Sequence, residues 1–276
     1  MEVVTVVLSS LLLLISPVGI VVDQVAENAI RSQLAGAESL DIRIDNGPSY
    51  QLLQGKVDKI RIAGRGISPI EGLRFAVAEL ETDPIDLEFG SLRNGEVVLD
   101  EALQGAVHLV LTEEDVNAFL LSPFVQDRLS QITIDGLAPA QARERARYKI
   151  VNPEIDFIEG DRIKVSVLLE DLVQGGGLFV EAETGVSIVS GDRIVLDTPT
   201  VTADGQPVPP QLFVPVLDGL TEQLSLQQLE AQGLTARVLN LDMAADSLDL
   251  AMWVRVDPSV TSDVATTEPL ESSIVE

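Results

Sequence analysis

The chain of 276 residues contains no cysteine and only one histidine, His108. Without cysteine there can be no disulfide framework and no thiolate metal site, and a single histidine cannot make a histidine-rich metal site. No serine stands in a nucleophile motif, so His108 has no evident triad partner. The sequence therefore predicts no catalytic residue, no metal site and no cofactor.

Basic and aromatic residues are also scarce. There are 18 Lys and Arg against 44 Asp and Glu, the net charge is −26, and aromatic residues make up 4% of the chain. Nucleic-acid binding needs clustered basic side chains and often aromatic stacking platforms, so we expect no nucleic-acid partner. An anionic membrane surface would also repel this chain, except at local basic patches.

Charge is missing altogether from residues 3–22, a stretch long enough to span a bilayer as a helix. No basic residue precedes it, so it lacks the positive start of a secretory signal, and the positive-inside rule gives no orientation. Three interpretations stay open: a retained membrane anchor, which we favour, a cleaved signal, and helices that plug the protein's own apolar surface. We predict an anchor or signal in 1–22, one domain over 23–256 and a disordered acidic tail over 257–276.

Alternating apolar and polar residues dominate the rest of the chain. In the first such run, Leu40, Ile42 and Ile44 point one way while the residues between them point the other. This period of two is typical of half-buried strands. The runs that predict strands are 40–45, 50–63, 73–82, 105–111, 148–158, 162–170, 178–189, 193–203 and 248–256.

Helical patterns are few. A short helix is predicted after Thr112, which can cap it, with Asp115 three residues on. The longest predicted helix runs over 210–232 and stops at Gly233. Its apolar residues at helical spacing are Phe213, Leu217, Leu220 and Leu224. The patterns together predict an α+β protein in which an antiparallel sheet packs on a long amphipathic helix.

Several segments resemble one family. They are 43–46, 48–58, 61–66, 79–86 and 109–113, and they are similar to the LmeA-like family of bacterial envelope phospholipid-binding proteins, most closely its cyanobacterial-type members. The resemblance is close over the first 120 residues and general beyond them. It implies phospholipid binding and a tubular lipid-binding fold, which is an elongated, strongly curved antiparallel sheet wrapped around a long helix. It supplies no catalytic residue.

Eight of the 18 basic residues fall in two ten-residue segments, 56–65 and 141–150. Guanidinium groups bind phosphate in a bidentate manner, so these segments could contact lipid head groups. The alternative is that both are edge strands protected from aggregation by charge. The head-group candidates are Lys59, Arg61, Arg143, Arg145 and Arg147.

The predicted function is non-catalytic binding of a phospholipid or other acyl lipid in an apolar groove. The protein would be attached to a membrane through residues 3–22. The family resemblance implies that this location is the extracytoplasmic cell envelope. The alternative is a structural or scaffolding envelope protein with a closed core. The predicted groove residues are Ile60, Ile62, Ile163, Val165, Val167, Phe213, Leu217, Leu220, Leu224, Leu250 and Met252.

Overall fold

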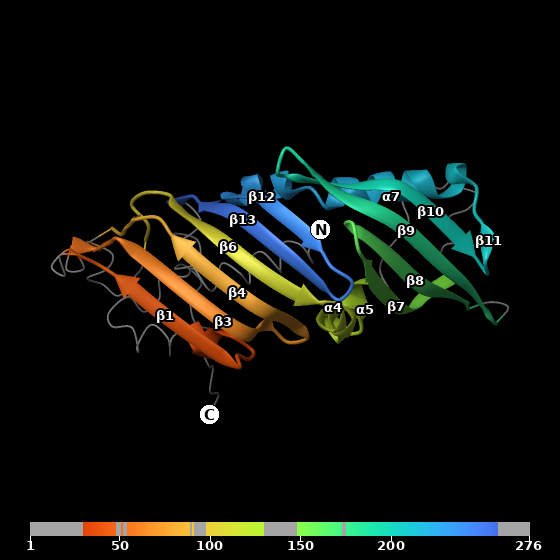
Figure 1. The fold of residues 1–276 in the computed structure, drawn as a ribbon, viewed down its shortest axis with the longest axis horizontal. Helices are drawn as coiled ribbons and strands as arrows, with labels where there is room; N and C mark the ends of the chain where they lie inside the picture. Colours follow the sequence, from red (N-terminus) through yellow and green to blue (C-terminus); the bar gives the residue numbers. More distant parts are fainter. Residues whose placement is uncertain are drawn as a thin grey trace, which may run out of the picture.

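The computed structural model describes residues 30–258, apart from 48–50, 52–53, 89, 91–97, 130–147 and 173–174. Antiparallel strands form two large sheets that follow one another along an elongated molecule, with a few short helices (Figure 1). The α+β class is confirmed. The single curved sheet of the prediction is divided into two sheets, and neither is closed around a helix in the described part of the chain.

The first sheet has six strands. In spatial order they are β1 (Ser39–Asp45), β3 (Lys59–Ile70), β4 (Leu73–Thr82), β6 (Leu103–Thr112), β13 (Ser247–Val256) and β12 (Leu234–Met243). The strands β2 (Lys56–Val57) and β5 (Ile85–Asp86) form a separate two-stranded sheet, and their Val57 and Ile85 belong to the same core. The register places one apolar row across the strands, because Ile42 faces Ile62, Ile62 faces Leu80, and Leu80 faces Val107.

The apolar face of the first sheet is the core of the protein. Ile67, Phe75, Leu109 and Val57 are its most completely buried large side chains. Residues from outside the sheet, such as Leu226 and Leu229, complete the same cluster. This face of the first sheet is therefore closed, and its burial accounts for much of the hydrophobic stabilisation of the fold.

The second sheet has five strands. In spatial order they are β11 (Gln206–Pro207), β10 (Arg193–Ala203), β9 (Gly177–Val189), β8 (Arg162–Asp171) and β7 (Tyr148–Ile158). The runs predicted at 148–158, 162–170, 178–189 and 193–203 are confirmed as these strands. Each pairs with the strand before it in sequence, apart from β7, which follows the undescribed segment 130–147.

Two short helices, α4 (Glu113–Leu120) and α5 (Pro123–Leu129), lie between the sheets in the chain. The predicted cap is confirmed, since the backbone N–H of Asp115 donates to Oγ1 of Thr112 at 3.1 Å. The side-chain carboxylate of Asp115 accepts two hydrogen bonds from Arg74 on β4, at 2.8 and 3.0 Å, and these attach α4 to the first sheet. This pairing neutralises a buried carboxylate, as burial requires.

The predicted helix over 210–232 is wrong beyond Gln223. The helix α7 (Pro210–Gln223) ends there, and a 3₁₀ helix, η3 (Leu226–Gln232), follows up to Gly233, the predicted stop. Two contacts explain the break. The side chain of Ser225 caps the new turn by accepting from Gln227 N, and the N–H of Leu226 donates to the carbonyl of Asp192 at 2.8 Å. The helix α7 packs against β10, the penultimate strand of the second sheet.

Several polar contacts join the two sheets, some of them through α4. The side-chain amide of Asn117 on α4 bonds both backbone groups of Ile155 in β7, each at 2.8 Å. The carboxylate of Asp161, in the β7–β8 turn, accepts from the backbone N–H of Met243 at 3.0 Å. The carbonyl of Gly191, in the β9–β10 turn, accepts from Val238 N at 2.7 Å. The backbone of an edge strand and two hairpin turns therefore fix the sheets to each other.

Among the described residues, no helix is both long and apolar enough to cross a membrane. The predicted anchor at residues 3–22 lies outside the described residues, as does the predicted tail from residue 259 onward. Both stay predictions.

Candidate functional site

One face of the second sheet is almost entirely apolar. Antiparallel partners share a face, and Val165 stands between Ile155 on β7 and Ala182 on β9, while Val167 stands beside Val180. We call this surface the open face. Its residues are Ile150, Ile155, Phe157, Ile163, Val165, Val167, Leu169, Leu178, Val180, Ala182, Thr184, Val186, Ile188, Ile194, Leu196, Val201 and Ala203.

The open face differs from the core in how far it is covered. Only Phe157, Thr184 and Val201 on it are buried, and its other side chains are half-buried. In the corresponding apolar row of the first sheet, the side chains of the five strands from β1 to β13 are buried, and Val238 on the edge strand β12 is half-buried. The buried ones are Ile42, Ile62, Leu80, Val107 and Met252. A sheet face of this size that stays partly exposed is unusual for a soluble protein and indicates a binding surface.

The helix α7 adds further apolar surface beside β10. Phe213 and Leu217 are half-buried, whereas Leu212 and Leu220 are 60% and 42% exposed. A surface helix normally turns its polar residues to water and its apolar stripe to the core. Because α7 has large apolar side chains on its exposed side as well, it extends the apolar surface of the second sheet.

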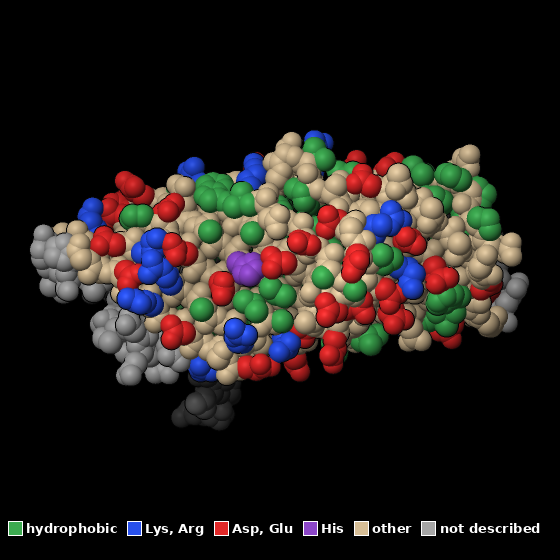
Figure 2. Space-filling view, viewed as in Figure 1, with side chains coloured by type: hydrophobic (Ala, Val, Ile, Leu, Met, Phe, Trp, Pro, Cys, Tyr) green, Lys and Arg blue, Asp and Glu red, His purple; other side chains and the backbone are tan. Residues whose placement is uncertain are grey.

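The basic side chains of the second sheet's strands all lie on the face opposite to the open face. They are Lys149, Arg162, Lys164 and Arg193. Arg162 pairs with Glu183 at 2.7 Å and Lys164 with Asp156 at 2.7 Å. The hydrogen bond from Lys164 to Asp156 raises the pKa of the Lys164 ammonium group. This polar face is turned toward the reader in Figure 2, where many red and a few blue side chains, with green ones between them, cover the second sheet.

The structure divides the predicted groove residues between the two sheets. Ile163, Val165 and Val167 come together on the open face, and Phe213, Leu217 and Leu220 lie on α7, with Leu224 directly after it. Ile62 and Met252 are instead buried in the core of the first sheet, and Ile60 and Leu250 pack against that core.

Sequence reasoning missed most of the open face, including Ile155, Val180 and Leu196. The alternation of apolar and polar residues along 148–158, 178–189 and 193–203 could have pointed to these side chains. Alternation shows which residues of one strand share a face. It does not show which strands lie in the same sheet, and that assignment decides membership of the open face.

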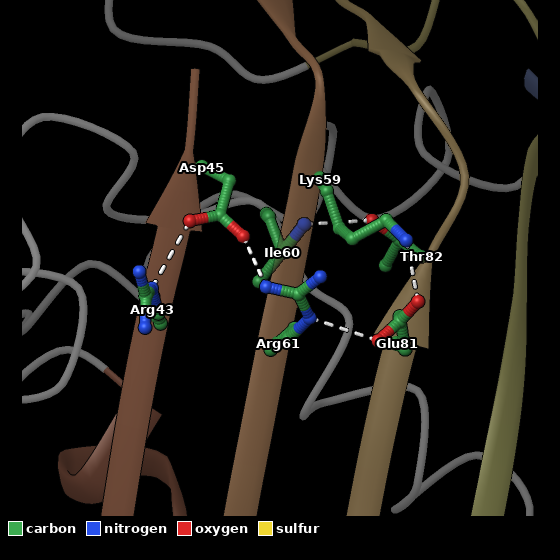
Figure 3. A network of polar contacts seen from close by, with 7 residues as sticks. All are labelled: Arg43, Asp45, Lys59, Ile60, Arg61, Glu81 and Thr82. Carbon is green, nitrogen blue, oxygen red and sulfur yellow. Dashed lines mark hydrogen bonds and ion pairs between the residues drawn. The ribbon is translucent and has the colours of Figure 1, made fainter. Parts of the chain in front are cut away.

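Lys59 and Arg61 lie on the outer face of the first sheet, on the side of β3 opposite to Ile62 (Figure 3). Arg61 bridges Asp45 on β1 and Glu81 on β4, where its Nε donates to Oε2 at 2.8 Å. Lys59 donates to the same Glu81. The two donors, Lys59 first and Arg61 second, lower the pKa of the Glu81 carboxyl group.

The structure bears on one of the two interpretations of segment 56–65, the edge strand. The strand β3 lies between β1 and β4, so the interpretation of segment 56–65 as an edge strand is wrong for β3. The cations are satisfied by cross-strand carboxylates, which stabilise a sheet. The remaining head-group candidates, Arg143, Arg145 and Arg147, lie outside the described residues.

His108 on β6 occupies the same outer face of the first sheet and is the purple side chain in Figure 2. Its Nε2 lies 3.0 Å from Asp249 and its Nδ1 lies 3.2 Å from Glu79. The hydrogen bond with Asp249, supported by the one with Glu79, raises the pKa of the His108 imidazole. In the described part of the chain, no cluster of His, Cys, Asp and Glu could hold a metal ion.

This raised pKa predicts a pH-dependent stability. A group whose pKa is higher in the folded than in the unfolded chain stabilises the fold fully below its unfolded pKa, about 6.5 for histidine. That contribution is lost as the pH rises through the folded pKa. We therefore expect His108→Gln to lower the melting temperature of the full chain in detergent at pH 5.5, and to have a smaller effect at pH 9. A pH-independent difference would show that protonation of His108 does not contribute.

The sequence matches the LmeA-like phospholipid-binding family over residues 15–252. The match covers most of the chain, so the protein belongs to this family, as the resemblance of its first segments indicated. No curated protein and no solved structure matches the chain.

Proposed function

We propose that the protein binds a phospholipid or a related acyl lipid on the open face of the second sheet, without catalysing a reaction on it. The observation that carries the proposal is the contrast between the sheets, since one apolar face is closed in the core and the other is only half-buried. Membership of a phospholipid-binding family supports the choice of ligand.

Acyl chains supply the main part of the binding free energy in this proposal. Burying a methylene group stabilises by about 0.8 kcal/mol, so ten of them contribute roughly 8 kcal/mol before the entropic cost of association. The chains would lie across Ile163, Val165 and Val167, with Phe213 and Leu217 of α7 forming one wall of a groove. The sequence analysis predicted a long helix enclosed by the sheet. In this arrangement α7 lies beside the sheet and lines the groove instead.

The head group would be bound by Arg143, Arg145 and Arg147. These residues directly precede β7 in the sequence, and β7 forms one side of the open face. Lys59 and Arg61 are weaker candidates, because they belong to the first sheet and already pair with Asp45 and Glu81. We further propose that residues 3–22 hold the protein at a membrane of the cell envelope.

The second candidate function is that of a structural envelope protein, and the closed core around Phe75 and Leu109 favours it. In that case the open face would be covered by protein. Native mass spectrometry of the full chain released from membranes by a mild detergent separates the two. Lipid binding predicts adducts of phospholipid mass that are exchangeable with added phospholipid. A chain that carries no lipid and takes up none when phospholipid is added would instead favour the structural function.

A further inference from the structure

The end of the second sheet that points away from the first sheet, at the right of Figure 1, has an unusual surface. We call it the distal end. It is formed by the β8–β9 and β10–β11 turns and by the first turn of α7. Phe179 on β9 is tied to the β10–β11 turn by two hydrogen bonds with Asp204, at 2.8 and 3.1 Å.

Three large apolar side chains of the distal end are exposed. Leu172, in the β8–β9 turn, is 59% exposed, Phe179 is 43% exposed, and Leu212 on α7 is 60% exposed. Each comes from a different segment of the chain, and green side chains are visible at this end of the molecule in Figure 2. Exposed leucine and phenylalanine gathered at one end of a molecule indicate a surface that contacts something apolar.

The distal end is also where the open face ends. Leu169 on β8 and Leu178 on β9 face each other there, directly before the β8–β9 turn, and Ala203 ends β10 beside Val180. The open face therefore reaches the distal end at Leu169 and Leu178, close in the chain to Leu172 and Phe179. Phe179 itself belongs to the opposite face of the sheet, because it pairs with Leu168.

The charges at the distal end argue against docking by electrostatic attraction. Residues 165–192 and 194–236 contain no Lys or Arg. Glu170 and Asp204 lie at this end, and among the described strand residues there Lys149, opposite Glu170, is the one basic side chain. Contact with a membrane through the described residues of this end would therefore come from burial of apolar side chains in the interface.

We propose that the distal end docks on a phospholipid bilayer by inserting Leu172, Phe179 and Leu212, and that lipid passes between the bilayer and the open face at this point. The second part rests on the proposed function, whereas the docking itself does not. A second protein copy is the competing occupant, and the experiment below distinguishes it from a bilayer.

The absence of native cysteine allows a specific label at one position at a time. Full-length Leu172→Cys, Phe179→Cys and Leu212→Cys proteins, each carrying an environment-sensitive NBD dye, are reconstituted in phosphatidylcholine vesicles. Leu121→Cys and Leu239→Cys are the matched controls, because these leucines are 57% and 66% exposed but lie away from the distal end. The readouts are the NBD emission maximum and its quenching by spin-labelled phosphatidylcholine.

We expect blue-shifted emission and at least two-fold quenching for the three distal labels, with water-like emission for both controls. Distal labels that emit as in water, or controls quenched to the same extent, would overturn the docking proposal. Blue-shifted distal labels that spin-labelled lipid does not quench would assign this end to a contact between protein copies instead. Native mass spectrometry of the same proteins tests lipid binding separately from docking. Lipid adducts on a protein whose distal labels are not quenched would overturn the docking proposal alone. Quenched distal labels on a protein without lipid adducts would overturn the proposed function alone.

Discussion

Replacing Val165 with Asp is expected to lower the amount of phospholipid that co-purifies with the full chain at least ten-fold. Val165 lies in the middle of the open face, between Ile155 and Ala182, and is half-buried. In the lipid-free protein, water can reach the new carboxylate, so the fold should persist. Under a bound acyl chain the same carboxylate would lose its hydration without gaining a partner, which costs several kcal/mol, and about 1.4 kcal/mol corresponds to a factor of ten in affinity.

The matched control is Val195→Asp. Val195 is also half-buried in the second sheet, but it pairs with Ser187 on the polar face. The two variants therefore add the same charge to opposite faces. Lipid should be lost from the Val165 variant and retained by the Val195 variant, as measured by native mass spectrometry with circular dichroism as the test of folding. Equal lipid content in two folded variants would place the ligand elsewhere.

Asn117→Ala is expected to destabilise the protein by about 2 kcal/mol, at the junction of the two sheets. The Asn117 amide satisfies both the N–H and the C=O of Ile155, at the free edge of β7. Its removal deletes two hydrogen bonds and leaves two part-buried backbone groups without protein partners, and each loss of this kind costs on the order of 1 kcal/mol or more. For a chain of this size, the melting temperature should fall by roughly 4–8 °C.

Two further variants make the measurement specific. Asn117→Asp keeps an acceptor for the N–H of Ile155 but loses the donor for its carbonyl, so we expect an intermediate loss. Glu114→Ala changes an exposed residue of the same helix and should alter the melting temperature by less than about 2 °C. If Asn117→Ala melts like Glu114→Ala, the hydrogen bonds between Asn117 and Ile155 do not hold the sheets together.

The sequence predicted local structure well where one short-range pattern decides it. Alternation located the strands at 40–45, 73–82 and 162–170, and Thr112 marked the start of α4 because a capping side chain needs only the next three residues. The helix over 210–232 was predicted too long. Its break depends on a hydrogen bond from Leu226 to Asp192, 34 residues earlier in the chain, and no local pattern contains that contact.

What the sequence determined by itself is which side chains of each strand share a face, because the period of two follows from backbone geometry. Val165 and Met252 therefore look alike in the sequence, each in an alternating apolar row. Only the tertiary structure decided that Met252 is buried in a closed core and that Val165 belongs to the open face. The physical reason is that burial depends on what packs across from a face, and those groups come from distant parts of the chain, such as Leu226 and Leu229 beneath the first sheet.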